Sequence, residues 1–175
     1  MSAHPEFQSR TENTTDVWLT PPSLVKSLGH FDLDPCSPIG APWRLAPLWY
    51  TEVEDGLKQP WHGRVFMNPP YGAKTKVWLE KMKRHGNGIA LVPSRVETKM
   101  FFDHVWGVAD AILFPNKRIH FFSNDGAKGK SPNFAAVLIA YGRHNVDALR
   151  TCEARGAIIE RDGVCLNVLQ TTPET

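Results

Sequence analysis

The sequence predicts an α/β fold with an antiparallel finish. Apolar runs alternate with amphipathic helical segments through the middle of the chain. Residues 89–92 are apolar on both faces, which is typical of a parallel strand buried inside a sheet. Residues 118–122 and 134–140 resemble two strands around a loop of Gly, Lys and Ser, which predicts an antiparallel pair. The alternation favours a compact sheet with helices on both faces.

Local signals define the elements of the first half. Thr20 before Pro21 and Pro22 predicts a helix N-cap, and Gly29 suits the position just past the helix end. Pro35 closes the next strand, because proline cannot donate to a sheet ladder. The expected order is a helix at 20–28, a strand at 31–34, an irregular stretch at 35–63, a strand at 65–67 and a helix at 75–84.

The second half is expected to continue this alternation before the antiparallel finish. Apolar residues on one face of 97–106 predict a helix between two strands. Asp162-Gly163 is typical of a tight hairpin turn. The expected order is a strand at 89–92, a helix at 97–106, strands at 111–114, 118–122 and 134–140, and a small hairpin formed by 157–160 and 164–168.

Length and composition indicate an ordinary globular domain. The chain has 175 residues, 42% hydrophobic and 22% charged, with a net charge of +2. We expect one domain at 16–170, a polar lead-in at 1–15 and a tail at 171–175. So small a net charge neither requires nor excludes nucleic acid, since a basic surface can be local.

The cysteines and the hydropathy pattern favour a cytoplasmic protein. The three cysteines form no CxxC pair, and no His/Cys group has zinc-ligand spacing, so we expect reduced thiols and no metal. No apolar stretch reaches the roughly 18 residues of a membrane span. The N-terminal residues lack the apolar core of a signal peptide, and we expect no membrane partner.

The stretch Asn68-Pro69-Pro70-Tyr71 is the strongest chemical signal in the sequence. It follows the apolar run 65–67 directly, so it lies where ligand sites form in open α/β sheets, beyond the carboxyl end of a strand. A ring-conjugated amino group is a poor nucleophile, because its lone pair is delocalised. The Asn68 side-chain oxygen and the Pro69 carbonyl, held rigid by the prolines, can accept its two hydrogens and free that lone pair.

In this interpretation, Tyr71 offers a flat face on which the substrate ring stacks. The structural alternative is a strand end with a proline turn and a buried tyrosine. An isolated Asn-Pro-Pro would favour that alternative. The apolar run before the motif and the aromatic ring after it favour the catalytic interpretation.

These residues resemble the Asn/Asp-Pro-Pro-Tyr/Phe motif of amino-group methyltransferases, which use S-adenosylmethionine to methylate adenine N6, cytosine N4 or a glutamine amide. Around the motif, one ordered series spans residues 16–142: "WLTPPSLV", "FDLDPCSP", "YTEVEDGL", "LVPSRVETKMFF" and "KRIHFF…SPNFAAVLIAY". This series resembles the phage-type DNA N6-adenine methyltransferase (Dam) family. The resemblance implies a Rossmann-like methyltransferase sheet, S-adenosyl-L-methionine as cofactor, DNA as partner, and modification of phage or prophage DNA against restriction in a bacterial cytoplasm.

The resemblance also implies roles for individual residues. Asn68, Pro69, Pro70 and Tyr71 would be catalytic, and Asn68 would also contact the cofactor. The first cofactor motif would begin at Asp34, near the methionine end of the cofactor. Asp55 is the first choice for the cofactor adenine and Glu52 for its ribose, since carboxylates accept hydrogen bonds from amino and hydroxyl groups. The full set expected to bind the cofactor is Thr20, Pro21, Asp34, Pro35, Cys36, Glu52, Asp55 and Asn68.

The sequence departs from the usual methyltransferase pattern in two places. Residues 36–40 contain one glycine, where a glycine-rich loop is usual. The stretch 35–67 is short for the strands and helices that normally lie there, so either the sheet is trimmed or this region is mostly loop. The chain also has no segment large enough for a separate recognition domain, which favours relaxed sequence specificity.

Adenine N6 is paired inside a duplex, so the enzyme must flip the base or act on single strands. Phosphate contacts then require cations, and aromatic rings among them suit unstacked bases. The expected DNA-binding residues are Lys74, Lys76, Arg95, Lys117, Arg118, Phe121, Lys128 and Lys130. A solvated loop with core phenylalanines is the structural alternative for the residues around 117–130.

Three other functions remain open from the sequence. The same fold could act on cytosine N4 or on a protein glutamine. Enzymes of the first kind more often carry serine at position 68, and those of the second kind normally keep a glycine-rich first motif, so both comparisons favour adenine. A non-catalytic nucleic-acid-binding protein on a decayed methyltransferase fold would explain the missing glycines, but not the intact motif. We expect a monomer or a weak dimer.

Overall fold

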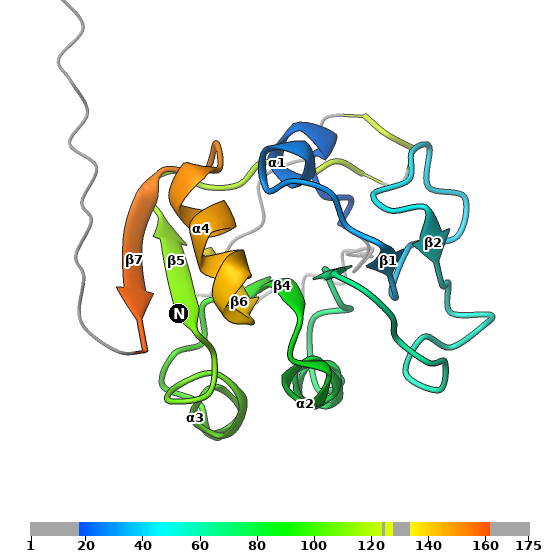
Figure 1. Cartoon of the computed structure of the whole chain (residues 1–175). Helices are drawn as coiled ribbons and strands as arrows, with labels where there is room; N and C mark the ends of the chain where they lie inside the picture. The colour runs from blue at the N-terminus through cyan, green and yellow to red at the C-terminus, as the bar shows by residue number, and fades with distance from the viewer. Residues whose placement is uncertain (1–17, 124, 128–133, 162–175) are drawn as a thin grey trace, which may run out of the picture.

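The computed structural model describes residues 18–123, 125–127 and 134–161. Its helices are α1 (Pro22–Ser27), α2 (Thr75–His85), α3 (Lys99–His104) and α4 (Arg143–Thr151). Its strands are β1 (Leu33–Asp34), β2 (Leu48–Trp49), β3 (Val65–Met67), β4 (Gly88–Pro93), β5 (Ala111–Pro115), β6 (Ala136–Tyr141) and β7 (Gly156–Glu160). The strands form one sheet in the order β2-β1-β3-β4-β6-β5-β7 (Figure 1).

The sheet is mixed, and the predicted α/β class with an antiparallel finish is confirmed. Strands β2, β1, β3 and β4 are parallel neighbours. Strand β6 lies between β4 and β5 and pairs antiparallel with both of them, and β7 pairs antiparallel with β5 at the edge. Strands β1, β3, β4 and β5 therefore run in the same direction, and their carboxyl ends lie along one side of the sheet. We call this side the sheet edge where strands end, as distinct from the edge strands β2 and β7.

Helices cover both faces of the sheet, as the sequence predicts (Figure 1). Alternate side chains of a strand point to opposite faces, so β4 contributes to two hydrophobic clusters. Ile89 and Leu91 pack with residues of α1 and α4, whereas Ala90 and Val92 pack with residues of α2 and α3. All six residues of β4 are buried, as expected of a central strand.

The first half of the chain follows the expected order with a trimmed sheet. Strands β1 and β2 have two residues each, and most of 35–63 is loop, so both expectations for this region hold. Helix α1 differs in its start: Pro21 is the N-cap, and no side chain caps the helix. Gly29 has φ +94°, which suits its place just past the helix end.

The C-terminal half contains two differences from the expected elements. The strand expected at 118–122, all of whose residues the structure describes, is absent. The pairing described for these residues is a single bridge between Phe122 and Leu19. Helix α4, which the sequence reasoning left without an assignment, packs against the sheet. Strand β7 pairs with β5, while the second half of the expected hairpin, 164–168, lies outside the described residues.

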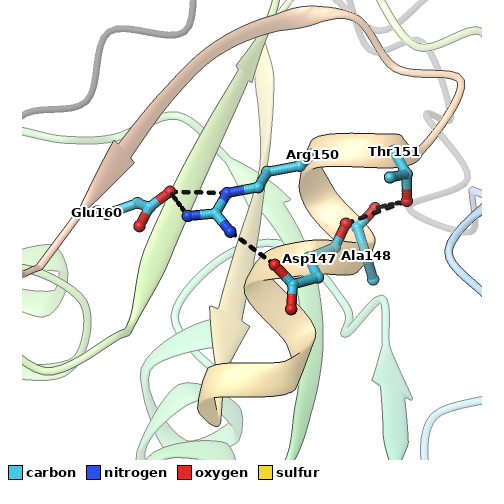
Figure 2. A network of polar contacts seen from close by, with 5 residues as sticks. All are labelled: Asp147, Ala148, Arg150, Thr151 and Glu160. Carbon is cyan, nitrogen blue, oxygen red and sulfur yellow. Dashed lines mark hydrogen bonds and ion pairs between the residues drawn. The ribbon is translucent and has the colours of Figure 1, made fainter.

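A polar network joins α4 to the edge strand β7 (Figure 2). The Arg150 guanidinium donates from Nε and Nη2 to Glu160 Oε1, at 3.0 and 2.6 Å, and from Nη1 to Asp147 Oδ1 at 2.6 Å. One arginine therefore connects α4 to the edge strand β7. Among the described residues, no helix is long and apolar enough to cross a membrane.

Candidate active site

A cavity of about 780 Å³ opens at the sheet edge where β1 and β3 end. Its walls come from residues 35–39 after β1, residues 51–57 after β2, and residues 68–78 after β3, together with Trp18. Ligand sites of open α/β sheets form at this edge, and the volume lies in the range of cofactor pockets. We call this cavity the main pocket.

The side chain of Asn68 lies at the wall of the main pocket and is held at both ends of its amide. Its Nδ2 donates to the Trp18 carbonyl at 2.9 Å and to Thr20 Oγ1 at 3.0 Å. Its Oδ1 accepts from the Tyr71 hydroxyl at 2.8 Å. The amide nitrogen therefore faces the segment 18–20, and the amide oxygen faces Tyr71.

The backbone after Asn68 is fixed by prolines and by one buried hydroxyl. Thr75, 3% exposed, accepts from the Gly72 amide and donates to the Pro70 carbonyl, both at 3.1 Å. The Pro69 carbonyl accepts no hydrogen bond from the residues described. It is therefore available to accept a hydrogen bond from a ligand.

Tyr71 lines the main pocket, and its ring forms a T-shaped pair with that of Phe134, at a centroid distance of 5.1 Å and an interplanar angle of 86°. Burial raises the pKa of the Tyr71 phenol above its ordinary value, so the hydroxyl keeps its proton at any physiological pH. It is a hydrogen-bond donor here and not a base.

The acidic wall separates into two kinds of carboxylate. Glu54 accepts from the Thr51 amide and hydroxyl at 2.8 and 2.6 Å, so it closes its own turn. Glu52 and Asp55 line the main pocket, and Asp55 Oδ1 also accepts from the Leu57 amide at 3.2 Å. The Lys58 side chain, 3.0 Å from Asp55, holds the pKa of the Asp55 carboxyl below its usual range. Asp55 is therefore an ionised hydrogen-bond acceptor at the pocket wall, where its two oxygens also contact Leu57 and Lys58.

The loop carrying these carboxylates is anchored from both sides. Asp55 has φ +53°, a left-handed conformation that aspartate tolerates and that is common where a loop is strained at a site. A Cβ added at Gly56 would lie 1.9 Å from the Pro35 carbonyl oxygen, so only glycine allows this approach. From α2, Lys81 Nζ donates to the carbonyls of residues 56, 57 and 59 at 2.6–3.1 Å.

A small recess lies behind Asn68 and contains Asp34, which is 3% exposed. Burial raises the pKa of the Asp34 carboxyl from 3.8 to about 7, although hydrogen bonds from the Cys36 amide and the Ser37 side chain oppose the rise. Burial and the neighbouring Asp34 also raise the pKa of the Cys36 thiol. Cys36 lines both cavities as a neutral thiol.

The structure brings together most of the expected cofactor residues. Pro35, Cys36, Glu52, Asp55 and Asn68 line the main pocket. Two others, Asp34 and Thr20, lie in the small recess behind it.

Pro21 lines neither of these two cavities. It lies instead in a third recess, between α1 and residues 115–122. The contact of Pro21 with the cofactor stays a prediction.

The expected DNA-binding residues divide by position. Lys74 lines the main pocket, while Lys76 is exposed on the first turn of α2. Arg95 follows β4 at the same sheet edge. Lys117 and Arg118 line the recess beside α1, and Lys128 and Lys130 lie outside the described residues.

Phe121 is a correction to the expected DNA-binding surface. Its side chain is 0% exposed and packs in the core against Trp18, at a ring distance of 6.2 Å. A buried ring cannot stack on a base. The core alternative for this phenylalanine is therefore the correct one.

Sequence reasoning missed Trp18 and Lys81 as parts of the site. Trp18 stands in the quoted "WLTPP" stretch, but its contribution is a backbone carbonyl, which no side-chain pattern reveals. Lys81 is one of several lysines and arginines on α2, and only the tertiary structure selects it as the anchor of the acidic loop.

A comparison with known protein families assigns the chain to a family independently of the site geometry. Residues 8–161 match the model of the family described as DNA N-6-adenine-methyltransferase (Dam). No curated protein and no solved structure gives a significant match. The match covers most of the chain, including the main pocket and all of the described strands. The chain therefore belongs to the Dam family, and it is an enzyme that methylates adenine N6 in DNA.

Proposed function

We propose that the main pocket binds S-adenosyl-L-methionine and that Asn68 and Pro69 hold the adenine amino group during transfer. The observation that carries this proposal is that Asn68 lines the same pocket as two acidic residues of another loop, Glu52 and Asp55. The bound cofactor supplies an activated methyl group. The residues of the chain bind it, orient the base and hold the N6 protons.

The donor and acceptor set of the main pocket fits this cofactor. Glu52 and Asp55 accept hydrogen bonds from ribose hydroxyls or an adenine amino group, and Leu57 and Trp78 offer apolar surface for the ring. Cys36 lines the main pocket together with Asn68, and Asp34 lies in the small recess behind them. This arrangement directs the methionine end of the cofactor toward the catalytic motif.

Catalysis then rests on two acceptors and a ring. The Asn68 Oδ1 and the Pro69 carbonyl accept the two N6 hydrogens, which shifts the nitrogen toward a pyramidal geometry and makes its lone pair available. Pro70 keeps the turn rigid, since its carbonyl is bound to Thr75. The Tyr71 ring stacks on the base, and its hydroxyl releases the Asn68 oxygen when the amino group arrives.

We further propose that DNA lies along the sheet edge with the target base turned into the main pocket. Lys74 at the pocket and Arg95, Lys117 and Arg118 in the neighbouring loops supply the phosphate contacts. The described residues form a single sheet with its helices and no separate recognition unit, which supports relaxed sequence specificity. Modification of phage or prophage DNA is the role that fits this specificity.

The decisive experiment compares the wild-type protein with Asn68→Ala. Plasmid DNA from a methylation-deficient bacterium expressing each protein is digested to nucleosides and analysed by mass spectrometry. We expect N6-methyladenine with the wild type only, while calorimetric binding of S-adenosylmethionine by Asn68→Ala stays within about threefold of wild type. N6-methyladenine formed by Asn68→Ala would refute the proposed role of Asn68. If the wild type does not bind S-adenosylmethionine, the main pocket is not a cofactor site.

A further inference from the structure

The carboxamide of Asn68 has two nearly equivalent orientations, and only one of them serves the reaction. Rotation by half a turn exchanges the oxygen, an acceptor, with the nitrogen, a donor. A substrate amino group needs the acceptor. Some part of the protein must therefore select the orientation, because the asparagine side chain alone does not.

The contacts on the far side of the amide make this selection. The atom of Asn68 that faces Trp18 lies 2.9 Å from a backbone carbonyl oxygen, which can only accept a hydrogen bond. An amide oxygen at that position would face another oxygen with no proton between them. The Thr20 hydroxyl, at 3.0 Å, provides a second acceptor for the same NH2 group.

The segment 18–20 is itself held in place by backbone pairing. Leu19 donates to and accepts from Phe122, at 3.0 and 2.9 Å. Successive residues of an extended chain point their backbone groups and side chains to alternate sides. With Leu19 turned to Phe122 and its side chain in the core, the Trp18 carbonyl and the Thr20 side chain are directed to Asn68.

We propose that Thr20 and the Trp18 carbonyl are positioning groups that hold the Asn68 oxygen toward the substrate. This inference rests on the proposed role of Asn68 as acceptor. It gives Thr20, which is 2% exposed, a task distinct from the cofactor contact expected from the sequence. The Tyr71 hydroxyl bonds the oxygen on the opposite side and is exchanged for the substrate amino group, whereas the Thr20 and Trp18 contacts persist through the reaction.

Two variants of Thr20 separate the hydroxyl from the rest of the side chain. Thr20→Val keeps the volume and removes the acceptor, while Thr20→Ser keeps the acceptor and removes a methyl group. We expect Thr20→Val to lower kcat by about 10- to 100-fold, as a misplaced catalytic group does, with the KM for S-adenosylmethionine changed less than twofold. Thr20→Ser should restore kcat to within about threefold of wild type, because an acceptor again faces Nδ2.

Several outcomes would overturn the inference while leaving the proposed function intact. These are wild-type kcat in Thr20→Val, an equal loss in Thr20→Ser, and a raised KM for the cofactor with unchanged kcat. In each case Asn68→Ala, assayed in parallel, must still be inactive. An active Asn68→Ala would instead refute the proposed function itself.

An Asn68→Asp variant provides a test that does not depend on the folding of the Thr20 variants. A carboxylate at position 68 would face the Trp18 carbonyl without a donor, whereas the protonated acid can donate there as the amide does. We expect this variant to be at least about tenfold less active than wild type at pH 8, and the ratio of variant to wild-type activity to rise as the pH falls toward 6. Comparison with the wild type at each pH removes the contribution of Asp34, which lies in the recess behind position 68. A pH profile that parallels the wild type would overturn the inference.

Discussion

At the scale of single residues, Asp34 is the group whose charge the fold opposes most clearly. It is buried behind Asn68, and burial raises the pKa of its carboxyl to about 7. Because the native state favours the protonated form, stability from this group is full below the unfolded pKa of 3.8 and is lost as the pH rises through about 7. The protein without ligand should therefore unfold more easily at pH 8 than at pH 5.

Asp34→Asn tests this prediction, because the amide has the shape of the carboxyl and no charge. The difference in the free energy of unfolding between variant and wild type should move in favour of the variant by about 2–3 kcal/mol from pH 5 to pH 8, because about two pH units lie between pH 5 and the raised pKa of about 7. Urea unfolding of the ligand-free proteins at several pH values measures this difference. Asp32→Asn, in the same segment at an exposed carboxyl, serves as the control. A pH-independent difference for Asp34→Asn would contradict the prediction.

At the scale of elements, the loop 51–57 forms the acidic wall of the main pocket through one close approach. Gly56→Ala would place a Cβ at 1.9 Å from the Pro35 carbonyl, so the loop must move away from residues 35–39. We expect a loss of about 1–3 kcal/mol in unfolding free energy, as for overpacking elsewhere in proteins. We also expect at least a tenfold weaker binding of S-adenosylmethionine, measured by calorimetry, because Glu52 and Asp55 move with the loop.

Val53→Ala is the matched control for this loop. Val53 is 76% exposed in the same segment, so its substitution should leave both stability and cofactor affinity close to wild type. Unchanged cofactor affinity in Gly56→Ala would mean that the acidic wall does not contact the cofactor. An equal loss in Val53→Ala would mean that the loop responds to any change.

At the scale of the whole molecule, the parallel strands gather their carboxyl-end loops at one sheet edge, where DNA must lie to reach the pocket. Lys74 sits at the mouth of that pocket. Each phosphate contact releases counterions, so Lys74→Ala should reduce the slope of log affinity against log salt by about 1. Fluorescence anisotropy with a labelled oligonucleotide over a range of salt concentrations measures this slope.

Lys83→Ala is the control at this scale, because Lys83 lies in the last turn of the same helix, at the opposite end from Lys74. Lys83→Ala should leave the slope of log affinity against log salt unchanged if DNA lies along the carboxyl ends of the parallel strands. Equal slopes for wild type and Lys74→Ala, or a lower slope for Lys83→Ala, would place the DNA elsewhere on the molecule.

The sequence by itself determined the features that depend on neighbouring residues. The apolar run before Asn68, the two prolines and the helix that follows are local patterns, and they predicted the end of β3, the turn and α2. The buried strand β4 followed from an apolar run too short and too continuous for a surface element. The order of motifs along the chain indicated the family that the family model independently assigns.

Only the tertiary structure decided which side chains of a segment meet. Glu52 and Asp55 line the main pocket while Glu54 does not and turns back to Thr51, and three acidic residues in one loop give no sign of that difference. Phe121 is in the core because the bridge between Phe122 and Leu19 sets its direction. Thr20 meets Asn68 across 48 residues of sequence. Such contacts depend on how distant segments pack, and packing is a property of the assembled fold and not of any local pattern.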